Sequence, residues 1–224
     1  MGSFLSLVCK RARCEAQKSQ RRSTLLEAAA RLLATQPIDE ISLNAIAREA
    51  NVSKANVYRY FESREELFLH LALEAASAWS TSVIQRLDRL DRLGDEAGVA
   101  RAFTETTVEH PVFARLVSVL STVLERNVSV EVVARFKLQM LAGMGELIGA
   151  VHRALPDLSP PQVIELLRAA YFQLVALWPA GHPPPAVQEA LKRPELADAC
   201  VDFEQTLTRT IVLLVRGLRS DAPD

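Results

Sequence analysis

The most constraining feature of this sequence is the segment of residues 42–61, whose apolar side chains recur at helical spacing around a central turn signal. Asn51 tolerates the left-handed conformation that a tight turn needs, and Ser53 is a favourable N-cap for a second helix. The segment therefore predicts two short helices joined by a tight turn, a shape that fits the major groove of DNA. The residues expected to face inward are Leu43, Ile46, Ala47 and Ala50 on the first helix, and Val57 and Phe61 on the second.

Polar side chains of the same segment gather on the faces that point away from this predicted core. A helix turns by about 100° per residue, so positions three and four apart form one outward stripe. Such a stripe of basic, aromatic and small side chains is suited to contacts with bases and phosphates. On the second helix it consists of Lys54, Ala55, Tyr58 and Arg59, and the first helix offers Asn44 and Arg48.

Composition and charge favour a helical globular protein with one basic end. Hydrophobic residues make up 49% of the 224 positions and glycine only 8, while no long stretch alternates as a strand would, so we expect an all-α fold. Residues 1–60 hold ten basic and five acidic residues, a net charge of +5, and residues 61–224 hold 16 and 22, a net charge of −6. This asymmetry is typical of a protein that docks on phosphate with one end, although uneven scatter by chance is the alternative.

The cysteines and the N-terminus give no sign of a metal site or a membrane segment. Cys9, Cys14 and Cys200 are too few and too scattered for a disulfide framework, and Cys200, at an apolar helical position, is expected to be a buried thiol. The apolar run of residues 4–8 is too short to span a membrane and lacks the preceding positive residues of a signal peptide. We therefore expect a cytoplasmic protein with no metal, no cofactor and no membrane partner.

Turn and cap signals divide the chain into three parts. Residues 1–20 are expected to form a flexible basic arm, residues 21–65 the helix-turn-helix unit, and residues 66–220 a larger helical domain; the prediction for the whole is about nine helices. Capping-box sequences at Ser63 and Ser159 mark the starts of two long helices. The predicted helices outside the opening segment are residues 21–35, 63 to 79 or beyond, 96–109, 111–127, a long helix from 129, 160–178 and 194–218.

The sequence resembles the tetracycline-repressor (TetR) family of bacterial transcriptional regulators. The resemblance lies in about 50 residues, with the motifs Ile46-Ala47-x-x-Ala50-x-Val52-Ser53, Val57-Tyr58-x-Tyr60-Phe61 and Ser63-Arg64-Glu65-Glu66-Leu67. One departure is Asn51, where the family usually has glycine. The resemblance implies a homodimer formed through the last two long helices, which presents both recognition helices to a double-stranded DNA operator. Half-sites about 35 Å apart then imply a palindromic operator.

The resemblance also implies roles for individual residues. Those matching base-reading positions are Lys54, Ala55 and Tyr58, with Asn44 contacting bases in some members, and those matching phosphate-contacting positions are Ser42, Asn56, Tyr60 and Arg64. Lysine is able to donate to guanine and the alanine methyl to touch a thymine methyl, while the exposed Arg59 suits either role. The alternatives are that Tyr58 and Tyr60 simply pack against the helix of residues 21–35 and that Arg64 is solvated. The basic arm is able to lie along DNA or enter a minor groove, or it adds only non-specific affinity.

The family resemblance further implies an effector pocket in the helical body. Met and aromatic side chains suit a large, adaptable apolar ligand, but the same residues at helical spacing also make an ordinary core. His110, just before Pro111 at a helix start, is a candidate polar anchor or a surface residue. The candidate wall is Phe103, His110, Phe113, Leu116, Leu120, Met140, Met144, Phe172 and Trp178.

The sequence therefore favours a repressor that binds a palindromic operator as a dimer and is released by a small, largely apolar effector. An enzyme is the contrasting class, and we do not expect one, because the four histidines lack metal-ligand spacing and no nucleophile motif or glycine-rich phosphate loop occurs. A helical ligand-binding or interaction protein that does not regulate transcription is the remaining alternative. Retained Lys54, Tyr58 and Arg64 argue against it.

Overall fold

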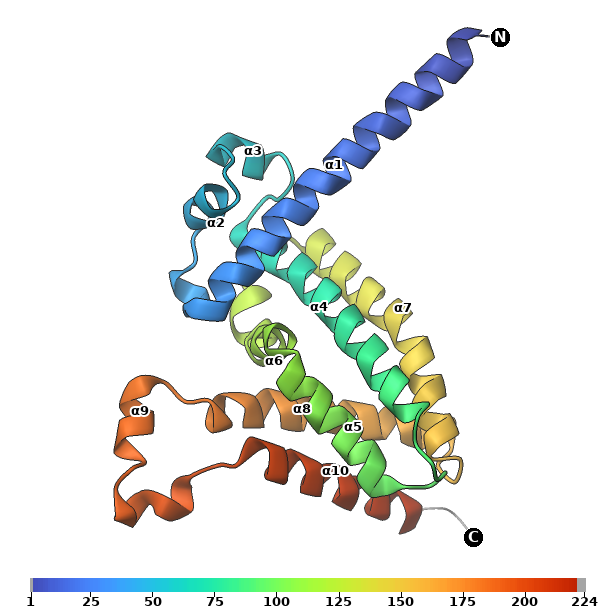
Figure 1. The fold of residues 1–224 in the computed structure, drawn as a ribbon, viewed down its shortest axis with the longest axis vertical. Helices are drawn as coiled ribbons and strands as arrows, with labels where there is room; N and C mark the ends of the chain where they lie inside the picture. Colours follow the sequence, from blue (N-terminus) through green and yellow to red (C-terminus); the bar gives the residue numbers. More distant parts are fainter. Residues whose placement is uncertain (1, 221–224) are drawn as a thin grey trace.

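A computed structural model describes the backbone of residues 2–220 and the side chains of residues 19–220. Within that range every regular element is helical, which confirms the all-α prediction. Figure 1 shows the N-terminal helices at one end of the molecule and the last helices at the other. The α-helices are α1 Gly2–Thr35, α2 Leu43–Glu49, α3 Lys54–Tyr58, α4 Arg64–Leu87, α5 Glu96–Glu109, α6 Pro111–Ser118, α7 Val130–Ala154, α8 Pro160–Gly181, α9 Pro185–Ala190 and α10 Phe203–Ser220.

Three short turns, η1 Ile38–Glu40, η2 Leu120–Leu124 and η3 Pro194–Ala199, complete the described helical elements. The cap signals explain several boundaries. The Ser63 hydroxyl accepts from the Glu66 amide at 3.0 Å where α4 begins. At the start of α8 the Ser159 amide donates to Gln162 Oε1 at 2.9 Å, the capping interaction that the sequence predicts.

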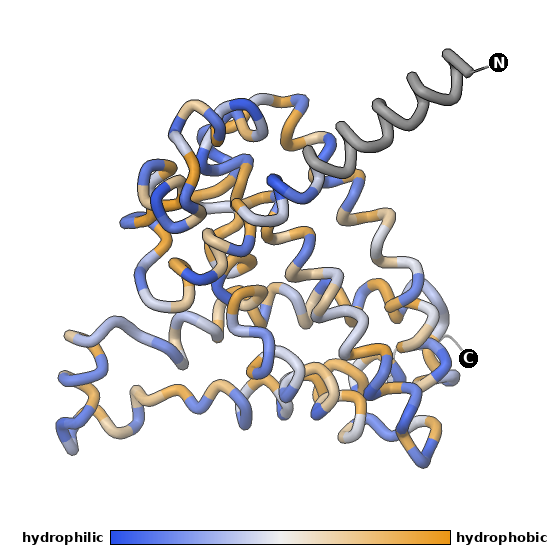
Figure 2. Tube along the Cα trace, turned by 45° about the horizontal axis from the view of Figure 1, so that its top comes forward, coloured by the Kyte–Doolittle hydropathy of each residue, from blue (hydrophilic) through white to orange (hydrophobic). Residues whose placement is uncertain are grey.

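Two buried cores organise the chain. One lies under α1, α2 and α3 and also receives Leu116 of α6, Leu120 of η2 and Phe136 of α7. The other fills the body between the second half of α4 and helices α5, α7, α8 and α10. In Figure 2 hydrophobic positions accordingly recur along nearly every segment of the trace. The N-terminal unit thus shares its core with helices of the body, across the domain boundary expected at residue 65.

Several predicted helix boundaries were wrong. The helix expected over residues 111–127 is divided into α6 and η2. Helix α1 begins at Gly2 and not near Arg21, so its backbone continues through the expected basic arm, whose side chains up to residue 18 lie outside the described part. The predicted helix over residues 194–218 is two elements, η3 and α10, separated at residues 200–202. As a result Cys200, expected to be buried, is exposed.

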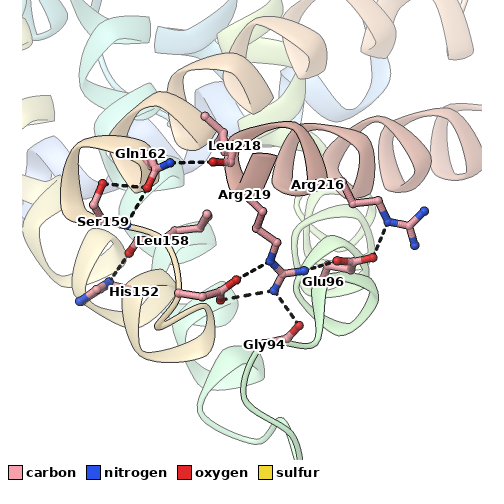
Figure 3. A network of polar contacts seen from close by, with 10 residues as sticks. Gly94, Glu96, His152, Leu158, Ser159, Gln162, Arg216, Leu218 and Arg219 are labelled. Carbon is pink, nitrogen blue, oxygen red and sulfur yellow. Dashed lines mark hydrogen bonds and ion pairs between the residues drawn. The ribbon is translucent and has the colours of Figure 1, made fainter. Parts of the chain in front are cut away.

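A network of polar contacts holds the end of α10 to the far end of the body (Figure 3). The Arg219 guanidinium contacts Asp157 and Glu96 and donates to the Gly94 carbonyl at 3.0 Å. Gln162 Nε2 donates to the Leu218 carbonyl at 2.6 Å. The hydrogen bond to Arg219 is the main cause that lowers the pKa of Asp157. These contacts join α10 to the α4–α5 and α7–α8 connections.

Helices α4 and α8 are each long and apolar enough, by length and composition alone, to cross a membrane, with a mean hydropathy of 1.3 over their most apolar windows. Both supply side chains to the cores, among them Phe68 and Trp79 of α4 and Leu174 and Trp178 of α8. Core helices of this kind pass the same test, so the hydropathy is weak evidence for a membrane span.

Candidate nucleic-acid interface

The turn between α2 and α3 has the geometry that the sequence predicts. Asn51 adopts a left-handed conformation with φ of 53°, and the Val52 amide donates to the Ala47 carbonyl at 2.9 Å to close the turn. The Ser42 hydroxyl accepts from the Ala45 amide at 3.2 Å and caps α2. Ser53 holds the N-cap position of α3, although its side chain makes no capping hydrogen bond.

Helix α3 presents the predicted polar stripe to solvent. It ends at Tyr58, earlier than expected, yet Phe61 beyond it is still buried in the N-terminal core with Val57. The Tyr58 side chain is 51% exposed, and the Lys54 ammonium lies 5.8 Å from the centre of its ring. This stacking orients a cation and a phenol in the same outward direction. Within the described residues the exposed stripe consists of Lys54, Ala55, Tyr58 and Arg59.

The other candidate residues surround this stripe with different degrees of exposure. Ser42 and Asn44 at the start of α2 are exposed. Asn56 and Tyr60 are half-buried, and Tyr60 packs against the N-terminal core, as the packing alternative expects. Arg22, just beyond the predicted arm, lies with its guanidinium 5.4 Å from the centre of the Phe61 ring.

Arg64 makes several hydrogen bonds within the N-terminal unit. Its guanidinium donates to the carbonyls of Ile38, Asp39 and Ile41 at 3.1–3.4 Å and to Glu65 Oε1 at 2.8 Å. These contacts tie the start of α4 to η1 and leave the side chain only 23% exposed. In this geometry the guanidinium stabilises the N-terminal unit, and a phosphate contact would compete with these hydrogen bonds.

The buried carboxylate of Glu66 joins the recognition unit to the body. Its Oε2 accepts from the Glu62 amide at 2.6 Å, in the link between α3 and α4, and its Oε1 accepts from the Arg135 guanidinium of α7 at 3.1 Å. The same oxygen lies 3.9 Å from His70 Nε2. The capping-box sequence identified Glu66, but no sequence pattern indicated that Arg135, 69 residues away, would reach it.

His70 provides a test of this junction through pH. Burial, followed by the charge of Arg22, lowers the pKa of His70 from 6.5 to about 4, against the opposing effect of Glu66. Because the folded protein favours the neutral imidazole, the unfolded chain binds the proton first as pH falls below 6.5. We expect the free energy of unfolding to fall by about 1–2 kcal/mol between pH 7 and pH 4 through this group, after allowance for partial exposure.

Urea unfolding of the wild type and of His70→Gln at pH 7 and pH 4.5 measures this effect. The variant should lose part of the pH dependence, since it has no imidazole to protonate. Equal pH slopes in the two proteins would contradict the assignment.

Arg115 makes a second link, from α6 to the end of α1. Its guanidinium donates to the Gln36 carbonyl at 2.8 Å and also contacts the Leu33 carbonyl. A cation at the C-terminal end of a helix satisfies carbonyls that lack intrahelical partners. Sequence reasoning missed Arg115; the available signal was a single charge within the otherwise apolar stretch from Val112 to Val117.

The residues expected to line one effector pocket are distributed over both cores and the surface. Phe103, Phe113 and Trp178 are buried in the body core, where Phe113 stacks on Trp79 with ring centres 4.6 Å apart. Leu116 and Leu120 belong to the N-terminal core. Met140 and Met144 are half-buried and pack against different cores, while His110 Nε2 lies 3.0 Å from Ser82 Oγ and Phe172 is 60% exposed. The single pocket expected from these residues is therefore not formed in this structure.

Two hollows among the described residues lie elsewhere. One, of about 480 Å³, is an open groove between α4 and α5 that includes Arg86, Arg101 and Glu105. The other, of about 330 Å³, lies where the α3–α4 link meets the start of α7 and includes Glu62 and Arg126. Neither contains any of the nine predicted pocket residues.

Comparison with known proteins identifies the class of this fold. Among solved structures, the fatty acid degradation regulator FadR from Bacillus halodurans is similar with a TM-score of 0.58 and 12% identity, covering 89% of this chain and 96% of that one. A TetR transcriptional regulator from Rhodococcus sp. RHA1 gives 0.52 and 19%, covering 91% and 99%. The TetR family repressor AlkX from Dietzia sp. strain DQ12-45-1b gives 0.52 and 14%, covering 89% and 95%. No curated protein sequence matches the chain.

Family models match nearly the whole described chain. Residues 25–71 match the model of bacterial regulatory proteins of the tetR family, and residues 73–222 match a tetracyclin repressor-like C-terminal domain. The protein therefore belongs to the TetR family of bacterial transcriptional regulators. Members of this family are in general non-enzymatic DNA-binding proteins that act as dimers and bind small-molecule effectors in the C-terminal domain.

Proposed function

We propose that this protein is a cytoplasmic repressor that binds a palindromic operator as a homodimer. The observation that carries the proposal is the exposed stripe of α3, in which Lys54 and Tyr58 point outward together from a turn of the required geometry. Ala55 and Arg59 complete the surface that enters the major groove, and Ser42, Asn44 and Asn56 flank it. Arg64 contributes by holding η1 against α4 and not by direct contact with phosphate.

The proposed dimer pairs α8 and α10 of one protomer with the same helices of its partner. These helices pack side by side, and each has an exposed apolar side chain in the middle of its outer face: Phe172 on α8 and Leu213 on α10. Gly217 lies on the same exposed side of α10, where a Cβ atom would meet nothing within 4 Å. A small residue there allows a second helix to approach closely.

Substitution of Phe172 tests this interface. In a two-fold dimer Phe172→Asp removes two buried phenyl rings, each worth about 1.5–3 kcal/mol, so we expect the dimer dissociation constant to rise by at least about 100-fold. Sedimentation equilibrium measures the change. Leu93→Asp is the matched control, because Leu93 is 71% exposed but lies in the α4–α5 connection and not on the outer face of α8 or α10. A Phe172→Asp protein as dimeric as the control would refute the interface.

We propose further that a small, largely apolar effector releases the operator. The body core around Trp79, Phe103 and Phe113 supplies an apolar, aromatic surface, and half-buried Met144 at its margin offers an adaptable side chain. Such a ligand would separate α6 from α4 and α8 and so act on α1 through Arg115. FadR is a regulator of fatty acid degradation, and AlkX is implicated in the biodegradation of n-alkanes. These compounds are therefore the first to test as effectors of this protein.

The effector is tested by displacement of labelled operator with medium-chain fatty acids and alkanes. Release at concentrations that also raise the melting temperature supports effector sensing. A protein that holds its operator unchanged through that panel would contradict the apolar-effector part of the proposal. A helical interaction protein without a regulatory role would select no operator at all.

A further inference from the structure

The segment of residues 182–202, which joins α8 to α10, projects from the body without burying any of its helical residues. We call it the α9–η3 segment. Neither α9 nor η3 contains a buried residue, and of residues 182–200 only Pro183, Ala190 and Leu191 are even half-buried. In Figure 1 it extends to the left of the other helices. The sequence predicts a single helix over residues 194–218, but the apolar side chains of this segment have no partner surface within the described chain.

The α9–η3 segment is nevertheless built as an ordered element with apolar side chains. Gln188 Nε2 donates to the Pro183 carbonyl at 2.7 Å, and consecutive prolines restrict the backbone that leads into α9. Val187 is 45% exposed and Leu196 38%. Helices of six residues are not stable in water without a surface to pack against. A surface outside this protomer would supply the packing that this segment lacks within its own chain.

Helix α7 carries an apolar surface of the same kind. Val130 is 78% exposed, and Leu138 and Leu141 are each 67% exposed. With exposed Ala134 and Gly145 they recur every three or four residues, so they form one face roughly 22 Å long. A Cβ atom on Gly145 would meet nothing within 4 Å, which leaves room for a closely packed partner. We call this face the α7 stripe.

We propose that, in the dimer, the α9–η3 segment of each protomer packs on the α7 stripe of a second copy of this chain. This inference rests on the proposed α8–α10 dimer. The segment leaves α8 at its C-terminal end, whereas α7 leads into the N-terminal end of α8 through residues 155–159. A two-fold axis perpendicular to α8 makes the α8 helices of the two protomers antiparallel. The α9–η3 segment of one copy then lies beside the C-terminal end of α7 in the other.

This arrangement accounts for the two unpartnered surfaces together. Figure 1 places α9 and α7 on opposite sides of one protomer, so they do not cover each other within a chain. Figure 2 shows hydrophobic positions along the projecting segment as well as in the body. In a two-fold dimer this contact forms twice, so both α9–η3 segments and both α7 stripes are buried.

Cysteine cross-linking tests the proposal, because exposed Cys200 already lies at the end of the segment. In the full-length chain with Cys9→Ser and Cys14→Ser, Leu141→Cys adds one thiol on the α7 stripe. Treatment with a short bismaleimide should link most of the protein into covalent dimers on a denaturing gel. Gln139→Cys in the same background is the matched control, since Gln139 is also exposed but lies roughly 160° around α7 from Leu141.

Two further measurements separate the possible outcomes. Light scattering of each variant before cross-linking reports the oligomeric state: a dimer that gives no Leu141-dependent cross-link overturns this inference and leaves the α8–α10 dimer standing, whereas a monomer overturns both. Adding Cys200→Ser to the Leu141→Cys variant should abolish the covalent dimer. A cross-link that survives this change would show that the two α7 stripes face each other, which contradicts the proposal.

Discussion

Lys54→Ala and Tyr58→Ala should each weaken operator binding by roughly 30-fold or more while leaving the protein folded. Both side chains are exposed on α3 and neither belongs to a core, so their truncation removes contacts to DNA and not packing. A single base or phosphate contact is worth about 1–3 kcal/mol, and a two-fold dimer loses it at both half-sites. Fluorescence anisotropy with a labelled operator measures the loss.

The same measurement distinguishes the role of each residue and includes its own control. Substitution of a residue that reads a base should relax the sequence preference. Substitution of a residue that contacts phosphate should lower the slope of log affinity against log salt concentration by about one unit. Arg101→Ala removes the same positive charge as Lys54→Ala, but from an exposed position on α5, and should leave affinity nearly unchanged. Equal losses for Arg101→Ala and Lys54→Ala would show that net charge alone explains binding.

Arg64→Met should destabilise the N-terminal unit by about 2–4 kcal/mol, because it removes a cation from a largely buried site and leaves a carboxylate without its partner. The guanidinium donates hydrogen bonds to three carbonyls of the η1 region and to the carboxylate of Glu65, a residue that is 8% exposed. For a protein of this size the melting temperature should fall by roughly 5–15 °C. Thermal unfolding followed by circular dichroism measures the change.

Arg64→Lys separates the structural role from a phosphate contact. Lysine keeps the charge but cannot reproduce the planar set of donors that reaches Glu65 and the carbonyls together. We expect it to restore little of the lost stability. Arg59→Met, at an exposed position on the α3 side, should leave the melting temperature unchanged. An Arg64→Lys protein of wild-type stability but with weakened operator binding would favour the phosphate contact instead.

Sequence patterns predicted local structure well wherever the signals were local. The bounds of α5 agree with the expected 96–109, and the capping signals at Ser63 and Ser159 mark the observed starts of α4 and α8. The turn at Asn51 was predicted from one residue type, because few residues other than glycine adopt its backbone conformation readily.

The errors concern relations between distant segments. The helix predicted over residues 194–218 placed Cys200 on an apolar face, but periodicity indicates a shared face only while the helix continues. Here the helical structure is interrupted at residues 200–202. The residues expected to line one pocket are dispersed for a related reason: spacing within a helix does not say which helices meet, and Phe172 is exposed while Phe103 lies in the core. The contacts of Arg64, Glu66 and Arg115 also depend on tertiary packing.

The central claim is that α3 of this protein reads a two-fold symmetric DNA site. Selection from a random pool of duplexes by the wild-type protein, sequenced beside selection by the Lys54→Ala/Tyr58→Ala variant, tests it most directly. We predict that the wild type enriches an inverted repeat with half-sites about 34–36 Å apart and that the variant does not. No enriched repeat with the wild type, or the same repeat with the variant, would contradict the account.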